Sequence, residues 1–345
     1  MSALRTGTSP RHSSTICAFV ALLALGGCAE LKQRAIRDAD LLEERLRYSN
    51  TLYADDTLRE SLQEIVERLL ANQPPEIYPQ NVHVLVQHRW RPRLILLQNG
   101  ALYVSTGLLA RLQNEAHIAA FFARELIANS NISLRGSSDR TRALETAQIL
   151  VGMLTTAGYP AQCAEDAFLE VEKNLQSEGR KYGDSLSERK SLQAIREAIA
   201  SVIVTRYSAM KDDGDDGRTR FEPHLGVLLL TLATADLDSA NPVSAKVVLD
   251  RYEAQFGANG RSRMLQAAVI QKQARDDTSY ERAIAVYLDA SRYAEAPPLV
   301  FKELGFLYRR RNATAESTAA FREYLRRSPN AIDAAIVETY IGNGQ

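Results

Sequence analysis

The sequence is short of three features that would narrow its class at once: cysteine, an excess of one charge, and long apolar runs. It holds only three cysteines, so no disulfide framework is expected and stability must come from packing. Lys+Arg and Asp+Glu both number 42 in 345 residues, which argues against a nucleic-acid-binding protein, because such proteins carry a basic footprint. The apolar run from Ile16 to Leu25 is too short to span a bilayer as a mature helix.

The N-terminal segment resembles the signal peptide of a bacterial lipoprotein. Arg5 and Arg11 precede the apolar run, which ends in Leu25-Gly26-Gly27-Cys28, a tetrapeptide similar to the lipobox. The resemblance implies removal of residues 1–27 and acylation of the thiol and the amine of Cys28. The alternative is an ordinary signal peptide with an incidental cysteine.

Acylation of Cys28 would also imply a location in the cell. Ala29, rather than aspartate, follows the cysteine, which in such lipoproteins implies an outer-membrane anchor with the protein facing the periplasm. Cys17 would leave with the signal, so we expect Cys163 to be a small core residue without a disulfide. Residues 28–54 are charge-rich and predict a tether and an N-terminal helix.

The segment that follows predicts a helix, a strand and a hairpin in that order. Asp56 or Thr57 can cap a helix whose apolar residues recur at helical spacing as far as the Pro74-Pro75 stop. Valines then alternate from Val82 to Val86 as in a strand. Asn99-Gly100, between two apolar runs, is a strong hairpin pattern.

The helix predicted over residues 114–130 carries an anomaly on its apolar face. Phe121, Phe122 and Leu126 share that face at helical spacing, and Glu125 lies in the middle of it. Burial of an unpaired carboxylate is costly, so Glu125 must be paired, protonated or exposed in a cleft. Each of these outcomes indicates a special site or the remnant of one.

The stretch from Leu94 to Asn129 resembles the active-site segment of metallopeptidase family 48, which includes the CAAX prenyl protease. The matching residues are Asn99-Gly100, Gly107-Leu108-Leu109, Asn114-Glu115-Ala116 and Ala123. The segment Ala157-Gly158-Tyr159 and the helix predicted after it match the family's next turn and helix. The resemblance implies a zincin-like α+β peptidase domain over residues 55–210.

The zinc-binding motif of that family, HExxH, is not retained. Two histidines four residues apart bind the zinc, and the intervening glutamate activates the metal-bound water. Here Arg124 and Ala128 stand at the histidine positions, and only Glu125 survives as a vestige. Counting back from Gly158 places Ala143 at the family's third ligand and Ala147 at the aspartate four residues later. A slip of one turn would instead bring Glu145 near that position.

Other candidate metal ligands do not rescue the site. Gly183-Asp184 stands where the family has His-Pro, although Ser185 and Glu188 keep the spacing of a capping box. The acidic run from Asp212 to Asp216 lacks EF-hand spacing, and its glycines predict a solvated linker over residues 211–220. Surface or packing roles are expected for the remaining histidines, which are His83, His88, His117 and His224.

Residues 221–345 show the period of tetratricopeptide repeats. Tyr287 and Phe321 lie 34 residues apart, as do Ala283 and Ser317. The last unit fits best, at Phe301, Leu304, Gly305, Tyr308, Ser317, Phe321, Tyr324 and Pro329. A degenerate earlier unit is predicted at Ala245, Leu249 and Tyr252, with residues 331–341 as a cap. Stacked helix pairs leave a concave surface that binds peptides or proteins. The alternative is an all-α domain without a binding groove.

Together these patterns predict a mainly α protein with a small β-sheet: a zincin-like domain followed by TPR-like helical repeats. We expect a catalytically inactive, metallopeptidase-like lipoprotein that binds envelope proteins or peptides through its cleft and its repeats. No cofactor and no nucleic-acid partner are expected. Two alternatives stay open at this point, namely an active zinc metalloendopeptidase with unconventional ligands, and a pure repeat adaptor whose front domain is only a spacer.

Overall fold

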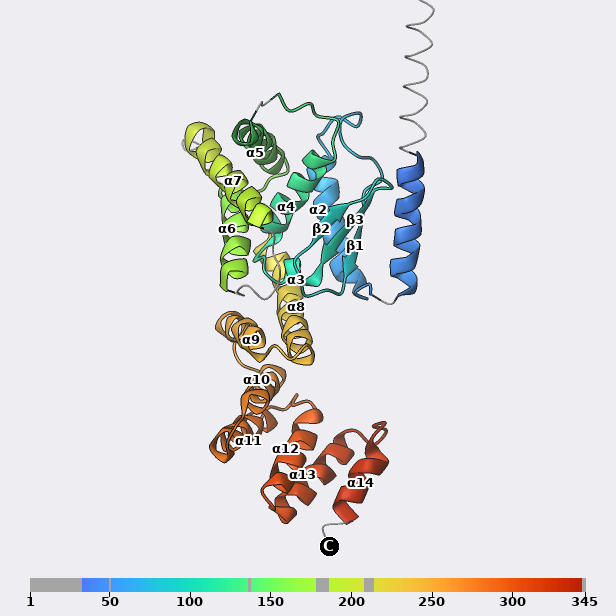
Figure 1. Ribbon diagram of the computed structural model, residues 1–345, viewed down its shortest axis with the longest axis vertical. Coiled ribbons are helices and arrows are strands. Elements are labelled where there is room, and N and C mark those ends of the chain that lie inside the picture. Colours follow the sequence, from blue (N-terminus) through green and yellow to red (C-terminus); the bar gives the residue numbers. More distant parts are fainter. Residues whose placement is uncertain (1–32, 50, 136–137, 178–185, 208–213, 343–345) are drawn as a thin grey trace, which may run out of the picture.

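The computed structural model describes residues 33–49, 51–135, 138–177, 186–207 and 214–342. Within these ranges the chain is mainly helical and holds one three-stranded sheet, as predicted (Figure 1). Cys28 and its lipobox, Gly183-Asp184, Ser185 and Asp212-Asp213 lie outside the described residues. None of the helices in the described ranges has the length and apolar character that a bilayer span needs.

The sheet is built around the predicted hairpin. Strands β1 (His83–Gln87), β2 (Leu94–Leu96) and β3 (Ala101–Ser105) lie in the order β1-β3-β2, so β2 is an edge strand. β1 runs parallel to β3, and β2 runs antiparallel to it. The turn at Asn99-Gly100 is confirmed, because Gly100 has φ +90°, a conformation that glycine adopts without a steric penalty.

Both faces of the sheet are covered. One face contributes Val84, Leu102 and Val104 to the main core, together with helix α2 (Asp56–Leu70). The other face carries Leu85, Ala101 and Tyr103, against which Leu46 packs from a helix over 33–48. This helix is drawn in blue at the right of the sheet in Figure 1. The predicted N-terminal helix therefore exists and lies flat on the sheet.

The predicted helix over 114–130 is helix α4 (Glu115–Ala128), and it lies at the centre of the front domain. It follows the short helix α3 (Thr106–Leu109), and Asn114 caps its start by accepting a hydrogen bond from the His117 backbone N–H. Helices α5 (Asp139–Thr156) and α6 (Gln162–Ser177) pack on α4, and α7 (Leu186–Val202) packs on α5 and α6. A short π-helical turn, Ile203–Tyr207, continues α7.

Two helices begin earlier than the sequence predicts, because residues upstream of the predicted starts cap them. α2 is capped by Asp55 rather than by Asp56 or Thr57, because the Asp55 carboxylate accepts the backbone N–H of Leu58 at 2.9 Å. The sequence predicts a helix from Leu144 to Ala157, but α5 begins earlier, at Asp139, because Ser138 and the residue three positions later form a reciprocal capping box. In both cases a short polar side chain satisfies backbone N–H groups that the first helical turn leaves open.

The C-terminal part is an array of consecutive helices that runs away from the front domain (Figure 1). Its helices are α8 (Arg218–Asp238), α9 (Pro242–Phe256), α10 (Gly260–Gln273), α11 (Asp277–Ser291), α12 (Leu299–Arg310), α13 (Thr314–Arg327) and α14 (Ala334–Gly342). The main core does not stop at the predicted boundary, because Leu225, Leu249 and Leu265 belong to the same apolar cluster as the front domain. The next cluster begins on α10 itself, at Ala267, and a further one surrounds Phe321 and Val337.

The best-matched repeat unit packs through a glycine. A methyl group at Gly305 on α12 would overlap the ring of Phe321 on α13, so only glycine permits this close approach. The Ser317 hydroxyl donates to the Gly305 carbonyl at 2.9 Å, which ties the same two helices together. Both contacts join residues that the repeat pattern had singled out.

Candidate functional site

The positions that the resemblance assigns to the HExxH motif lie on the C-terminal half of α4. Arg124 points toward α7, where its guanidinium donates to the Ser191 hydroxyl at 3.4 Å. Ala128 is the last residue of the helix and is exposed. Neither residue offers a lone pair to a metal, and a guanidinium stays protonated in proteins.

Glu125 is paired, which is the first of the three outcomes expected for it. Its Oε1 accepts the backbone N–H of Leu96 at 3.1 Å and the side-chain amide of Asn129 at 3.3 Å. Leu96 belongs to the edge strand β2, and its side chain is buried. The Glu125 carboxylate thus joins α4 to the sheet, since it satisfies a backbone donor that has no partner in the strand ladder.

The third ligand position of the family is also apolar. Ala143 packs against the main core, and Ala147 is fully buried in it. The nearby Glu145 accepts the backbone N–H of Arg135 at 2.8 Å, so its carboxylate holds the loop before α5. A slip of one helical turn therefore does not bring an unengaged carboxylate to this position.

The histidines outside α4 make structural contacts, as do the acidic groups around them. His83 Nε2 lies 3.1 Å from a Glu43 carboxylate oxygen, and the His88 ring stacks on Tyr53. His224 Nε2 lies 3.4 Å from the Ser61 hydroxyl. In the described part of the chain, no three residues among His, Cys, Asp and Glu form a group that could hold a metal ion. Cys163 is half-buried and packs against the main core.

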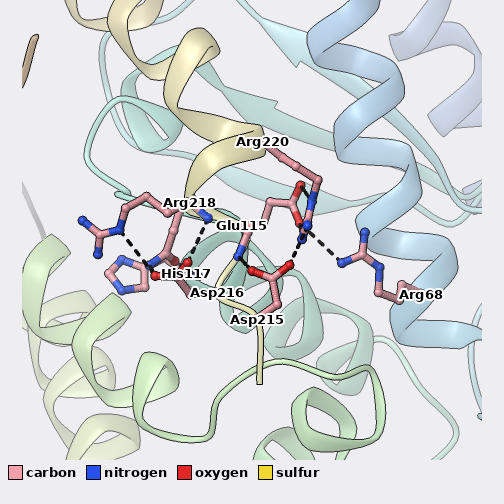
Figure 2. Close-up of polar contacts among 9 residues, drawn as sticks. Arg68, Glu115, His117, Asp215, Asp216, Arg218 and Arg220 are labelled. Atoms are coloured by element: carbon pink, nitrogen blue, oxygen red, sulfur yellow. Dashed lines mark hydrogen bonds and ion pairs between the residues drawn. The ribbon is translucent and has the colours of Figure 1, made fainter. Parts of the chain in front are cut away.

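A buried ion-pair cluster occupies the other end of α4. The Glu115 side chain is only 5% exposed, and Arg220 grips its carboxylate with Nε at 2.8 Å and Nη2 at 2.6 Å. Arg68 adds a third contact at 3.4 Å, and Arg220 also contacts Asp215 at 2.6 Å. Figure 2 shows the two arginines reaching Glu115 from α2 and from α8. We call these four residues the Glu115 cluster.

The prediction of a solvated linker over residues 211–220 is wrong for its described part. The Asp216 carbonyl accepts the backbone N–H of Ala116 at 3.0 Å, and the Asn114 amide donates to the Asp216 carboxylate at 3.1 Å. Gly217 has φ +65°, and a methyl group there would overlap the carboxylate of Glu115. The Asp-Gly composition did indicate a turn, but this turn is docked on the start of α4, where backbone N–H groups need acceptors.

His117 is buried beside this turn. It is 4% exposed, and its Nδ1 has no hydrogen-bond partner among the described residues. Its pKa is lowered to about 4, mainly by burial and also by the charges of Arg218 and Arg251, while the charge of Asp216 acts in the opposite direction. His117 is therefore neutral at physiological pH.

A second contact fixes the helical array to the front domain. Arg251 on α9 donates to the backbone carbonyls of Ala110 at 2.6 Å and Leu112 at 3.2 Å, just after α3. Burial lowers the pKa of this guanidinium, yet the two carbonyls satisfy its donors at the negative end of a short helix. With the Glu115 cluster, this contact joins the two parts of the chain.

The polar groups around α4 therefore connect this helix and its neighbours to other elements of the fold. Its paired carboxylates accept hydrogen bonds from the backbone or from arginine, and its arginines donate to carboxylates, carbonyls and a serine hydroxyl. Sequence patterns pointed to Glu125 and left a packing role open for His117, but they missed the pairing of Glu115 with Arg220 and the contacts of Arg251. No protein-family model matches the chain, and no curated protein matches it either.

Proposed function

We propose that the chain is a membrane-anchored, catalytically inactive, metallopeptidase-like lipoprotein that binds or scaffolds proteins of the bacterial cell envelope. In this proposal a zincin-like front domain has kept its structural residues and lost its zinc chemistry. The helical array is a set of TPR-like repeats that supplies binding surface for envelope proteins or peptides.

The observation that carries the proposal is the engagement of Glu125. A hydrolytic general base must stand within reach of a water held beside the substrate. The Glu125 carboxylate is instead held by the Leu96 backbone and the Asn129 amide, and its neighbours at the ligand positions are Arg124 and Ala128. A cation at one ligand position would repel a divalent metal ion.

The helical array supports the protein-binding part of the proposal. Its last unit places Gly305, Ser317 and Phe321 in mutual contact at the spacing of a tetratricopeptide unit. The adaptor alternative, in which the front domain is a mere spacer, fits less well. The main core runs from the front domain into α10, and Arg220 and Arg251 tie the two parts together.

Substitutions at Glu125 distinguish a structural carboxylate from a catalytic one. We expect Glu125→Ala to lower the free energy of unfolding by about 2 kcal/mol, because it leaves the buried Leu96 N–H without an acceptor. Glu125→Gln keeps an oxygen at that position and should cost less than about 1 kcal/mol. Denaturant unfolding measures both values.

The matched control is Glu64→Gln on the exposed side of α2, which should leave stability unchanged. A catalytic base behaves differently, because Glu→Gln would abolish peptide cleavage and leave stability intact. That pattern would reject the structural role of Glu125 and favour the active metallopeptidase.

The anchor is tested by changing Cys28. We expect Cys28→Ala to move the processed protein from the membrane fraction to the soluble periplasmic fraction, because a two-chain lipid anchor is lost. Fractionation and incorporation of labelled palmitate measure this result, and Cys163→Ala is the matched control that should stay at the membrane. Retention of processed Cys28→Ala in the membrane fraction after a high-salt wash, with no palmitate on the wild-type protein, would contradict the anchor.

A further inference from the structure

The helix over 33–48 presents a face that nothing in the described chain covers. Its inner side packs on the sheet through Ala39 and Leu46, and its Glu43 contacts His83. At helical spacing the opposite side carries a row that we call the outer stripe, made of Arg34, Arg37, Leu41, Arg45 and Tyr48. Because the helix is fixed against the sheet, the direction of this stripe is fixed too.

The outer stripe combines exposed apolar groups with arginines that have no salt bridge. Leu41 is 53% exposed and Tyr48 is 83% exposed, and both lie at a shallow hollow of about 400 Å³. None of the three arginines of the stripe forms an ion pair with a described residue. Asp38 and Glu44, both exposed, lie at the two margins of the stripe, so basic groups outnumber acidic groups there by three to two.

The predicted lipid anchor at Cys28 lies close in sequence to this helix, so it would bring the outer stripe near a membrane surface. Four residues separate Cys28 from the first described residue, Gln33, so an extended chain between them spans at most about 17 Å. Lipid on Cys28 would therefore hold the start of the helix, at Gln33, within that distance of the bilayer surface. Arginine at the headgroups and tyrosine at the interface are the residue types that a membrane surface favours.

We propose that the outer stripe docks on the surface of an anionic bilayer, and that this contact orients the front domain. The inference rests on the proposed anchor at Cys28. Leu41 and Tyr48 enter the interface, and Arg34, Arg37 and Arg45 lie at the level of the lipid headgroups. Since the helix is fixed to the sheet, and the array is fixed to the front domain, the lipid contact sets the direction in which the array projects.

Vesicle binding by the full mature chain carrying Cys28→Ala tests this contact without the anchor. We expect it to sediment with vesicles of phosphatidylethanolamine and phosphatidylglycerol, more weakly with phosphatidylcholine vesicles, and less in high salt. Leu41→Ser combined with Tyr48→Ser should reduce binding about tenfold. Loss of one stripe arginine should reduce it about fivefold, which is about 1 kcal/mol per basic residue.

The matched control is Val243→Ser with Val247→Ser on α9, an exposed apolar pair at 67% and 51% exposure, which should leave binding unchanged. No binding to anionic vesicles, or equal losses in the stripe and control variants, would overturn the proposal. A dimer that the stripe substitutions split, with no vesicle binding, would assign the face to a second copy instead. Failure of the anchor is seen separately, as absence of palmitate on the wild-type protein.

Discussion

Glu115→Ala is expected to lower the free energy of unfolding by about 3 kcal/mol. Removal of one partner from a buried ion pair costs about 3 to 5 kcal/mol, because the remaining charge loses its compensation. The lower end applies here, since Arg220 is 45% exposed and Arg68 34% exposed, so water can rehydrate them. Urea unfolding of the two proteins measures the difference.

An exposed pair provides the matched control for Glu115. Lys246 and Asp250 lie 2.5 Å apart on α9, with both side chains more than half exposed. Asp250→Ala should therefore cost less than about 0.5 kcal/mol, as exposed helical pairs do. Equal losses for Asp250→Ala and Glu115→Ala would contradict the view that burial makes the Glu115 cluster special.

The second large effect is a loss of stability in acid that originates at His117. Its pKa in the folded protein is about 4, below the ordinary value of 6.5. Below pH 6.5 the unfolded chain therefore binds a proton that the folded protein excludes. The contribution to stability is complete above pH 6.5 and is lost as the pH falls toward 4, by about 3 kcal/mol in total.

Unfolding measured between pH 7 and pH 4 tests this effect. We expect His117→Phe, an apolar ring in a buried place, to flatten the dependence of the unfolding free energy on pH. The charged groups that face His117 are Asp216, Arg218 and Arg251, and all three remain in this variant. His88→Phe at an exposed position is the control and should keep the wild-type slope. An unchanged slope in His117→Phe would place the acid sensitivity elsewhere.

Sequence patterns predicted much of the fold, because turns and helices depend on residues that are close together in the sequence. The Asn99-Gly100 turn needs a residue that tolerates positive φ, and Gly100 adopts φ +90°. The apolar periodicity around Phe121 and Phe122 predicted α4, which begins within one residue of the expected place. Gly305 and Phe321 were singled out by spacing alone, and they are in contact.

The contacts that join the two parts of the chain could not be predicted, because their partners are distant in the sequence. Glu115 and Arg220 are 105 residues apart, and periodicity shows which face a residue occupies but not which remote charge meets it. The turn at Asp215–Gly217 has the composition of a linker, and only the orphan N–H groups at the start of α4 explain why it docks there. Asn114 marked the start of α4 in the sequence, but it did not indicate that the Asp216 carbonyl accepts the Ala116 N–H there.

Glu125 shows how far a single anomalous residue can be interpreted. Its place on an apolar face predicted that it would be paired, protonated or in a cleft. In the structure its carboxylate accepts a hydrogen bond from the Leu96 N–H. The partner itself was unpredictable, since the contact depends on where β2 lies relative to α4. The anomalous carboxylate therefore located a contact between α4 and the sheet.

The most direct test of an inactive peptidase-like domain is metal analysis combined with proteolysis. The full mature chain, purified from zinc-supplemented cells, would be examined for zinc by elemental analysis and for casein cleavage. The account predicts no stoichiometric zinc, no cleavage, and a melting temperature unchanged by chelator, because Arg124, Ala128 and Ala143 stand at the ligand positions. One zinc per chain, with casein cleavage that chelator blocks and Glu125→Gln abolishes, would contradict it.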